Sequence, residues 1–185
     1  MQQLVIGITG ASGAIYAKRL LDKLVLLSDQ WSKVGVVMTH NGLANWELEV
    51  GKFSRDDYPF AFYDVRDFNA PFASGSAQFQ SMIICPCSMG MLARVSQGVS
   101  NDLITRSADV ILKERRRLVL VPREMPLSLI HLRNMVQLTE AGAIVAPAIP
   151  SFYSGEKDAT SVVDSVIDRI LDLVGFQVDR KRWGD

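Results

Sequence analysis

The chain has 185 residues, in which 20 Lys and Arg balance 20 Asp and Glu, so its formal net charge is zero. This length fits one domain over residues 1–185, large enough to bury about 70% of the surface of its unfolded chain. The balanced charge provides no overall field that would draw the chain to nucleic acid or to an anionic membrane surface. Any phosphate that it binds must therefore be met by local groups.

The N-terminus, the apolar runs and the cysteines predict a soluble, cytoplasmic protein. The N-terminus enters an apolar strand pattern within three residues and lacks the basic region and cleavage site of a secretory signal. The apolar runs are much shorter than the about 20 residues that span a bilayer. Cys85 and Cys87 lie too close for an easy disulfide, and beside two histidines they are too few for a zinc site. We therefore expect reduced thiols and no metal.

Apolar runs suited to buried strands alternate with helical patterns along the chain. The predicted strands are Leu4–Thr9, Val34–Met38, Met82–Cys85, Leu118–Val121 and Ala143–Ala146. The predicted helices are Ala14–Leu27, Gly42–Val50, Ser88–Val95, Asn101–Arg116, Leu127–Ala141 and Ser161–Val174. This alternation is typical of an α/β fold with one doubly wound, Rossmann-like parallel sheet. Such sheets bind ligands beyond the carboxyl ends of their strands, so the loops there are the candidate site.

Two segments fall outside this alternation. Residues 53–80 show no helical period, and their "APFASGS" stretch is rich in small residues. An irregular excursion of this length inside a compact domain is usually functional or an interaction arm. The second segment is the C-terminal tail, residues 176–185, which is mostly charged at its end.

The loop "TGASGA" after the first predicted strand is similar to the start of a phosphate-binding loop. Gly10 and Gly13 let the backbone approach a ligand closely, and the following helix directs N–H groups and its positive dipole end toward an anion. The glycine spacing fits neither the dinucleotide fingerprint nor the P-loop. The alternative is a plain tight turn in which the Ser12 hydroxyl caps the helix. The loop alone leaves both readings open.

The loop "CPCSMG" repeats this arrangement after the third predicted strand. Ser88 is placed to cap the next helix, and Gly90 permits close approach to a ligand. Cys87 is a candidate nucleophile because a helix N-terminus acidifies a thiol, although a small buried cysteine is the commoner state. Because both loops are expected at the same edge of the sheet, we predict that they bind the same ligand.

The segment "VPREMP" places Arg123 and Glu124 after the fourth predicted strand, between two prolines that fix the backbone. The two side chains form either a structural ion pair or a phosphate clamp with a proton donor, and we favour the clamp. The basic cluster Arg115–Arg117 ends a predicted helix, where we expect a solvated face that stabilises the helix dipole.

Seven segments together resemble the flavin prenyltransferase family, long known as 3-polyprenyl-4-hydroxybenzoate decarboxylases. They run in order through nearly the whole chain: "GITGASGAIYAKRLL", "VMTHNGLANWELE", "APFASGS", "MIICPCSMG", "SADVILKERRRLVLVPREMPLSLIHLRNM", "GAIVAPAIPSFY" and the terminal "RWG". One glycine loop is a weak signal, whereas seven ordered segments are specific. The resemblance also implies the flavoprotein fold of this superfamily.

This resemblance implies a metal-independent transferase. It would join the dimethylallyl group of dimethylallyl monophosphate to N5 and then C6 of reduced FMN, forming prenylated FMN and releasing phosphate. The family forms dodecamers and delivers its product to a UbiD-type decarboxylase, in ubiquinone synthesis among other pathways. The sequence does not indicate which decarboxylase is served.

The resemblance also assigns residues by their positions in the matching segments. The implied FMN-binding residues are Gly10, Ala11, Ser12, Thr39, Cys87, Ser88, Met89, Gly90 and Arg123. The implied prenyl phosphate site consists of Lys113, Arg123, Glu124, Tyr153 and Arg169, with Phe68 and Trp183 as further substrate contacts. Ser12, Glu49 and Glu124 are the implied catalytic residues, Ser12 near flavin N5 and Glu49 in a later proton transfer.

The chain departs from the family pattern at Phe68, and two other functions are alternatives to a prenyltransferase. Some relatives carry tryptophan where this chain has Phe68, and a phenyl ring attracts a cationic prenyl group less strongly. A flavin-dependent cysteine decarboxylase would share the fold, but typically carries a catalytic histidine after the second strand, where this chain has Glu49. A non-catalytic flavin carrier would need no prenyl phosphate site, so Lys113, Arg123 and Arg169 argue against it.

Overall fold

The computed structural model describes residues 1–152, 155–180, 182 and 184. Its strands are β1 (Gln2–Ile8), β2 (Trp31–Met38), β3 (Ala61–Tyr63), β4 (Ser81–Cys87), β5 (Arg117–Pro122) and β6 (Ile144–Val145). Its α-helices are α1 (Ala14–Leu26), α2 (His40–Glu49), α3 (Met89–Ser96), α4 (Leu103–Lys113), α5 (Leu129–Glu140) and α6 (Ala159–Leu173). Within these described residues, no helix is long and apolar enough to cross a membrane.

The six strands form one parallel sheet in the order β3-β2-β1-β4-β5-β6. Ile6 in the centre of β1 pairs with Val36 of β2 on one side and Ile83 of β4 on the other. The chain therefore builds outward from β1 in both directions, and the order reverses between β1 and β4. This is the doubly wound arrangement that the sequence predicts, and such sheets generally bind their ligands at the reversal point.

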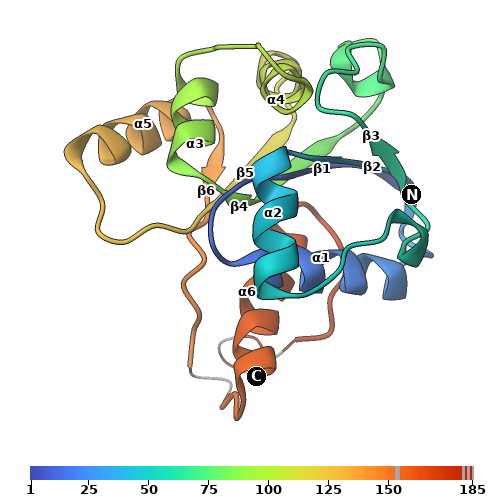
Figure 1. Cartoon of the computed structure of the whole chain (residues 1–185), viewed down its shortest axis with the longest axis vertical. Coiled ribbons are helices and arrows are strands. Elements are labelled where there is room, and N and C mark those ends of the chain that lie inside the picture. Colours follow the sequence, from blue (N-terminus) through green and yellow to red (C-terminus); the bar gives the residue numbers. More distant parts are fainter. Residues whose placement is uncertain (153–154, 181, 183, 185) are drawn as a thin grey trace.

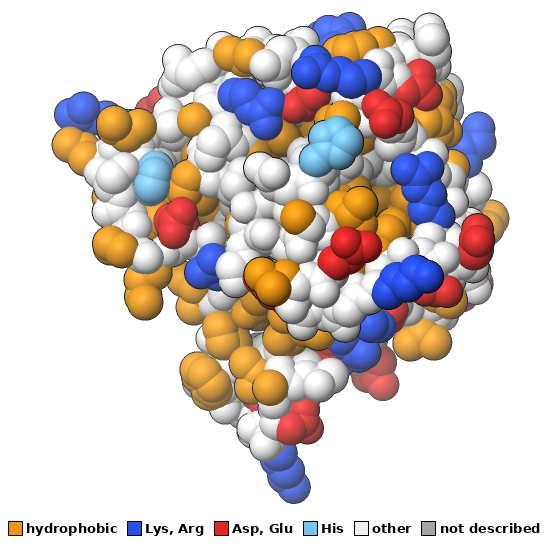
Figure 2. All heavy atoms as spheres, in the orientation of Figure 1, with side chains coloured by type: hydrophobic (Ala, Val, Ile, Leu, Met, Phe, Trp, Pro, Cys, Tyr) orange, Lys and Arg blue, Asp and Glu red, His pale blue; other side chains and the backbone are white. Residues whose placement is uncertain are grey.

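Helices cover both faces of the sheet. Figure 1 shows α1 and α6 on one side and α3, α4 and α5 on the other. Helix α5 protrudes from its layer, and Leu129, Ile130 and Val136 on it are 57–69% exposed. Figure 2 shows hydrophobic side chains at the surface of this protruding part.

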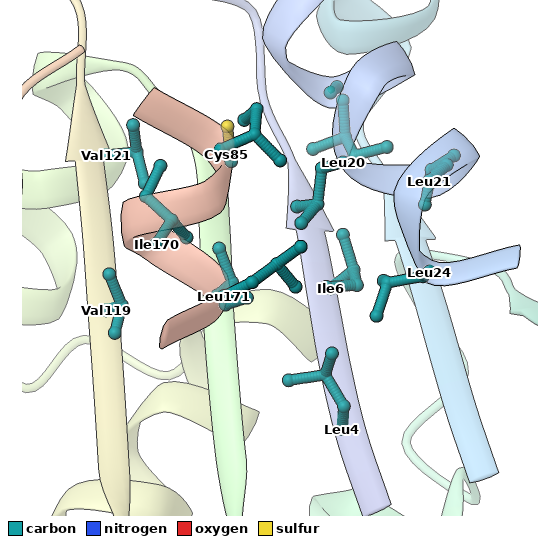
Figure 3. Packing of buried hydrophobic residues seen from close by; sticks show 14 of the residues in the cluster. Leu4, Ile6, Leu20, Leu21, Leu24, Cys85, Val119, Val121, Ile170 and Leu171 are labelled. Atoms are coloured by element: carbon teal, nitrogen blue, oxygen red, sulfur yellow. The ribbon is translucent and has the colours of Figure 1, made fainter. Parts of the chain in front are cut away.

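The side chains of each strand alternate between two apolar cores. Leu4 and Ile6 face the core that α1 and α6 complete, whereas Val5 between them faces the core beneath α3 and α4. Figure 3 shows the first core, where Leu20 and Leu21 of α1 meet strand residues and α6. Burial on both faces explains why these strands read as continuous apolar runs rather than as alternating patterns.

The excursion at residues 53–80 is less irregular than the sequence predicts. It contains the edge strand β3 and two short 3-10 helices, Arg55–Asp57 and Pro71–Ala73. Arg116 fastens it to the body by donating hydrogen bonds to the carbonyls of Gly75, Ala77 and Phe79 at 2.7–3.2 Å. The expectation that the basic cluster forms only a solvated face is therefore wrong for Arg116, which holds the loop in place.

The contact between Gly35 and Phe72 tests this packing. A Cβ added to Gly35 would lie 2.5 Å from Cε1 of Phe72, a ring that is only 2% exposed. We expect Gly35→Ala to lower the free energy of unfolding by about 1–3 kcal/mol, because overpacking forces the ring to shift. The matched control is Gly90→Ala, where nothing lies within 4 Å of the added Cβ. Urea unfolding of both variants in the absence of ligand would measure the difference, and equal stabilities would contradict it.

Candidate functional site

The loops that follow β1 and β4 are joined at the reversal point by one buried hydroxyl. Thr9, 2% exposed, donates from Oγ1 to the carbonyl of Pro86 at 2.8 Å. The same oxygen accepts a hydrogen bond from the backbone N–H of Ser88 at 2.8 Å. Ser88 in turn caps α3 by accepting from Met91 N at 3.2 Å, as the sequence predicts. The two glycine loops therefore form one rigid edge.

The loop after β2 closes against this edge. A Cβ on Gly10 would lie only 2.4 Å from Cβ of Asn41, so only glycine allows the first loop and α2 to approach so closely. Thr39 caps α2 by accepting a hydrogen bond from Gly42 N at 3.0 Å. Gly10, Ala11, Thr39 and Ser88 thus lie on adjoining loops at the carboxyl edge of the sheet.

Glu49, the last residue of α2, reaches the first turn of α1. One carboxylate oxygen accepts hydrogen bonds from the backbone N–H of Gly13 at 2.8 Å and of Ala14 at 2.7 Å. A helix N-terminus presents such N–H groups and a partial positive charge to anions. In this chain its own carboxylate fills that position on α1.

This contact rules out the alternative in which the Ser12 hydroxyl caps α1. The N-cap residue is Gly13, in a left-handed conformation with φ of 110°, and its helix has no side-chain cap of the ordinary kind. Ser12 is exposed, and its carbonyl accepts a hydrogen bond from Nε of Arg123 at 2.7 Å. The loops after β1 and β5 are thereby joined, and Ser12, Glu49 and Arg123 come together.

The surroundings of Glu49 favour its ionised form. Partial burial of the carboxyl opposes ionisation, but hydrogen bonds from Gly13 N, the Ser12 hydroxyl and Ala14 N, together with the charge of Arg123, outweigh it. The pKa of Glu49 is therefore below its usual range. A carboxylate that is ionised at neutral pH can accept a proton, which is compatible with the later proton transfer expected for Glu49.

Cys87 and Met89 direct their side chains into the apolar core rather than toward the edge. Cys87 is fully buried, and burial raises the pKa of its thiol to about 12, so the nucleophile hypothesis is wrong. Met89 is 8% exposed. Both residues can therefore meet a ligand only through their backbone, whereas Gly90 beside them is exposed and has open space in front of it.

Arg123 and Glu124 line a mostly apolar groove of about 500 Å³. Glu124 is exposed, and its carboxylate accepts a hydrogen bond from the N–H of Met125 at 3.1 Å. Arg169 lines a second cavity, of about 470 Å³, between α6 and the segment after β6. Pro147 and Ile149 form part of the wall of both cavities, so the two sites adjoin.

Other predicted substrate residues lie apart from this groove. Lys113 ends α4, where its amine bonds the carboxylate of Glu114 at 2.6 Å, beside Gly75. It precedes β5, whereas Arg123 follows that strand, so six residues of about 3.3 Å each separate the two ends. Phe68 is 46% exposed on the excursion and lines neither cavity. Tyr153 and Trp183 lie outside the described residues.

Two residues of the site were missed by sequence reasoning. Thr9 links the two glycine loops, and a buried hydroxyl at the end of an apolar strand is the signal that marks it. Tyr16 lies beside Gly13 and Arg123, and burial raises the pKa of its hydroxyl. Within the described ranges, no group of three or more His, Cys, Asp or Glu side chains is arranged to hold a metal ion.

Replacing Glu49 by Gln tests the charge at the start of α1. Because the pKa of Glu49 is lowered on folding, its stabilisation is present above the usual carboxyl pKa and disappears as the pH falls through the lowered value. We expect Glu49→Gln to lower the free energy of unfolding by about 0.5–1 kcal/mol at pH 7. This is near the lower end of the range for loss of a helix cap, because the carboxylate is exposed.

Urea unfolding at pH 7 and at about pH 3 would measure this effect. The difference between parent and variant should shrink at the lower pH, where Glu49 becomes protonated. The control is Glu47→Gln, an exposed residue of the same helix. A deficit of Glu49→Gln that stays the same at both pH values would contradict the electrostatic account.

Comparison with known proteins identifies the family of this chain. The model of the Flavoprotein family matches residues 1–175. The flavin prenyltransferase UbiX of Thermoplasma acidophilum is 45% identical over 98% of this chain and 99% of the relative. The FMN-dependent cysteine decarboxylase SpaF is only 18% identical, with a TM-score of 0.61 over 90% of this chain and 97% of that one, which shows a shared fold alone.

Two solved structures cover the whole of this chain. The crystal structure of AnUbiX (PadA1) in complex with FMN and dimethylallyl pyrophosphate has a TM-score of 0.93 and 39% identity, with 98% of that chain covered. A dodecameric FMN-dependent UbiX-like decarboxylase from Escherichia coli O157:H7 has a TM-score of 0.91 and 38% identity over its full length. The chain therefore belongs to the Flavoprotein family and, within it, to the UbiX flavin prenyltransferases.

Proposed function

We propose that this chain transfers the dimethylallyl group of dimethylallyl monophosphate to reduced FMN, releasing phosphate and forming prenylated FMN. The observation that carries the proposal is the meeting of Ser12, Glu49 and Arg123 at the reversal point, beside the Glu124 groove. Reduced FMN, when bound, supplies the electron-rich N5 and C6 positions that the dimethylallyl group joins. The chain supplies binding, charge and proton transfer.

The residues at the carboxyl edge fit FMN. Because Glu49 fills the N-terminus of α1, the flavin phosphate is left with the N-termini of α2 and α3. The first N–H groups of α3, at Met89 and Gly90, have no acceptor within their helix. The open space at Gly90 leaves room for a ligand. Thr39 and Ser88 add hydroxyls at the same two positions, so a phosphate monoester is suited to this edge.

Arg123 and Glu124 are suited to the departure of the prenyl phosphate. Arg123 is held through Nε, and its terminal nitrogens bond no acceptor in the described part of the chain, so they remain for a phosphate. Glu124 beside it lends a proton to the leaving group, which neutralises its developing charge. Glu49, ionised and bonded to the Ser12 hydroxyl, accepts the proton that is released later at the flavin.

A complete site requires more than one copy of the chain. Lys113 lies toward the opposite edge of the sheet from Arg123, so a neighbouring subunit would supply it. Met125, Ile149 and Phe152, all at least 72% exposed, give the surface near the groove an apolar character suited to subunit contact. We propose the dodecamer found for the UbiX-like decarboxylase of Escherichia coli O157:H7, and delivery of the product to a UbiD-type decarboxylase. The two free thiols suit the expected cytoplasmic location.

Mass analysis of the flavin tests the proposed reaction. The chain would be incubated anaerobically with FMN, a reductant and dimethylallyl monophosphate, and in parallel with the pyrophosphate that AnUbiX binds. We expect prenylated FMN from the monophosphate. Flavin of unchanged mass with both donors would favour the carrier alternative and contradict the proposal, and reaction with the pyrophosphate alone would correct the donor.

Ser12→Asp tests the place of the flavin. The new carboxylate would lie beside Glu49 and would repel an anionic cofactor, so we expect FMN affinity to fall about tenfold or more. Quenching of flavin fluorescence would measure the affinity. The control, Ser28→Asp, adds the same charge at an exposed turn between α1 and β2. An unchanged affinity in Ser12→Asp would remove Ser12 from the binding site.

Two substitutions test the division of labour between Glu124 and Glu49. We expect Glu124→Gln to slow phosphate release about a hundredfold or more, because it removes the proton donor. Glu49→Gln should still release phosphate but form little prenylated FMN, since the later proton has no acceptor. Both variants must first bind FMN. Parent rates of phosphate release in Glu124→Gln, or of product formation in Glu49→Gln, would refute these roles.

A further inference from the structure

Three arginines converge on one carboxylate at the end of α6. Asp172 accepts hydrogen bonds from Arg169 at 2.6 Å and from Arg180 at 2.9 Å through Oδ2, and from Arg182 at 3.0 Å through Oδ1. Arg169 lies one turn before Asp172 on the helix. The other two arginines belong to the C-terminal tail, which runs back beside α6 in Figure 1.

The four side chains differ in burial: Asp172 and Arg180 are mostly buried, whereas Arg169 and Arg182 are exposed. The side chains of Asp172 and Arg180 are 16% and 15% exposed, whereas those of Arg169 and Arg182 are 56% and 49% exposed. Hydrogen bonds from Arg182 lower the pKa of Asp172 to about 2 against the opposing effect of burial, with help from Arg180 and Arg169. The carboxylate is therefore ionised at neutral pH and holds all three guanidinium groups.

All three arginines line the cavity of about 470 Å³ that adjoins the groove of Arg123 and Glu124. Apart from Ser151 and Ser165, the rest of its wall is apolar, formed by Ala146, Pro147, Ile149, Val166 and Ile170. A cationic side and an apolar side in one cavity suit a molecule with an anionic head and a short hydrocarbon group. Three guanidinium groups and one carboxylate leave two unbalanced positive charges, which match a phosphate monoester dianion.

Arg180 carries an additional sign of a missing acceptor. It lines the cavity, and its Nε is buried with no hydrogen-bond partner among the described residues. A buried donor without an acceptor is rare in native proteins and calls for a specific explanation. A bound phosphate oxygen would supply the acceptor.

We infer that Asp172 is a positioning residue for the prenyl phosphate site and that Arg180 is a second phosphate-binding arginine beside Arg169. This inference rests on the proposed function, since it adds two residues to the site where Arg169 would bind the donor. Without the carboxylate, three like charges would repel one another and lose their common orientation. Asp164, two turns earlier on α6, does not belong to this cluster, because it forms an ion pair with Arg19 of α1 at 2.7 Å.

Steady-state kinetics of three variants test the inference. We expect Asp172→Asn and Arg180→Gln each to raise the KM for dimethylallyl monophosphate about tenfold, with kcat within about twofold of the parent, because they change binding rather than chemistry. FMN affinity should be unchanged. The control, Asp164→Asn, should lower thermal stability without changing KM. An unchanged or lowered KM in Asp172→Asn or in Arg180→Gln would overturn the inference.

A binding measurement separates this inference from the proposed reaction. Titration of the parent and the variants with dimethylallyl monophosphate, followed by phosphorus NMR, requires no turnover. If the parent binds this donor but forms no prenylated FMN, the proposed reaction fails while the assignment of Asp172 and Arg180 is still tested. Equal affinities in the parent, Asp172→Asn and Arg180→Gln would overturn the assignment alone.

Discussion

The contact between the Glu49 carboxylate and the first turn of α1 is the interaction on which the site depends. It joins the end of α2 to the start of α1, and Arg123 joins the same loop from β5. Three loops that are far apart in sequence are thereby fixed at one edge of the sheet. The same contact uses the anion-binding position of α1, and we propose that a ligand phosphate binds instead at the N-termini of α2 and α3.

Much of this fold could be predicted because buried parallel strands have a strong apolar signature. The five predicted strands all occur, and the cap at Ser88 follows a local rule that needs only neighbouring residues. β3 was missed because it has three residues and none is buried, so it lacks the apolar run that marks the central strands. Arg116 was misjudged because its acceptors lie about 40 positions earlier in the sequence.

The sequence could predict which loops lie at the carboxyl edge of the sheet, but not the hydrogen bonds that join them. The family segments identified the loops, but the sequence could not show that Glu49 rather than Ser12 would cap α1, since the two donors lie 35 and 36 positions from the carboxylate. Nor could spacing show that Cys87 would direct its thiol into the core. Lys113 and Arg123 are only ten positions apart in the sequence. Because β5 runs between them, they lie toward opposite edges of the sheet. Such a separation follows from the topology of the sheet and not from the spacing along the chain.

We propose that Glu49 occupies the N-terminus of α1 and that the flavin phosphate therefore binds at another helix. A crystal structure of the chain with FMN bound tests it most directly. We expect Glu49 to stay hydrogen-bonded to Gly13 and Ala14 while the phosphate lies at the N-terminus of α3 or α2, near Ser88 or Thr39. A phosphate bonded to Gly13 and Ala14, with the Glu49 carboxylate displaced, would contradict it.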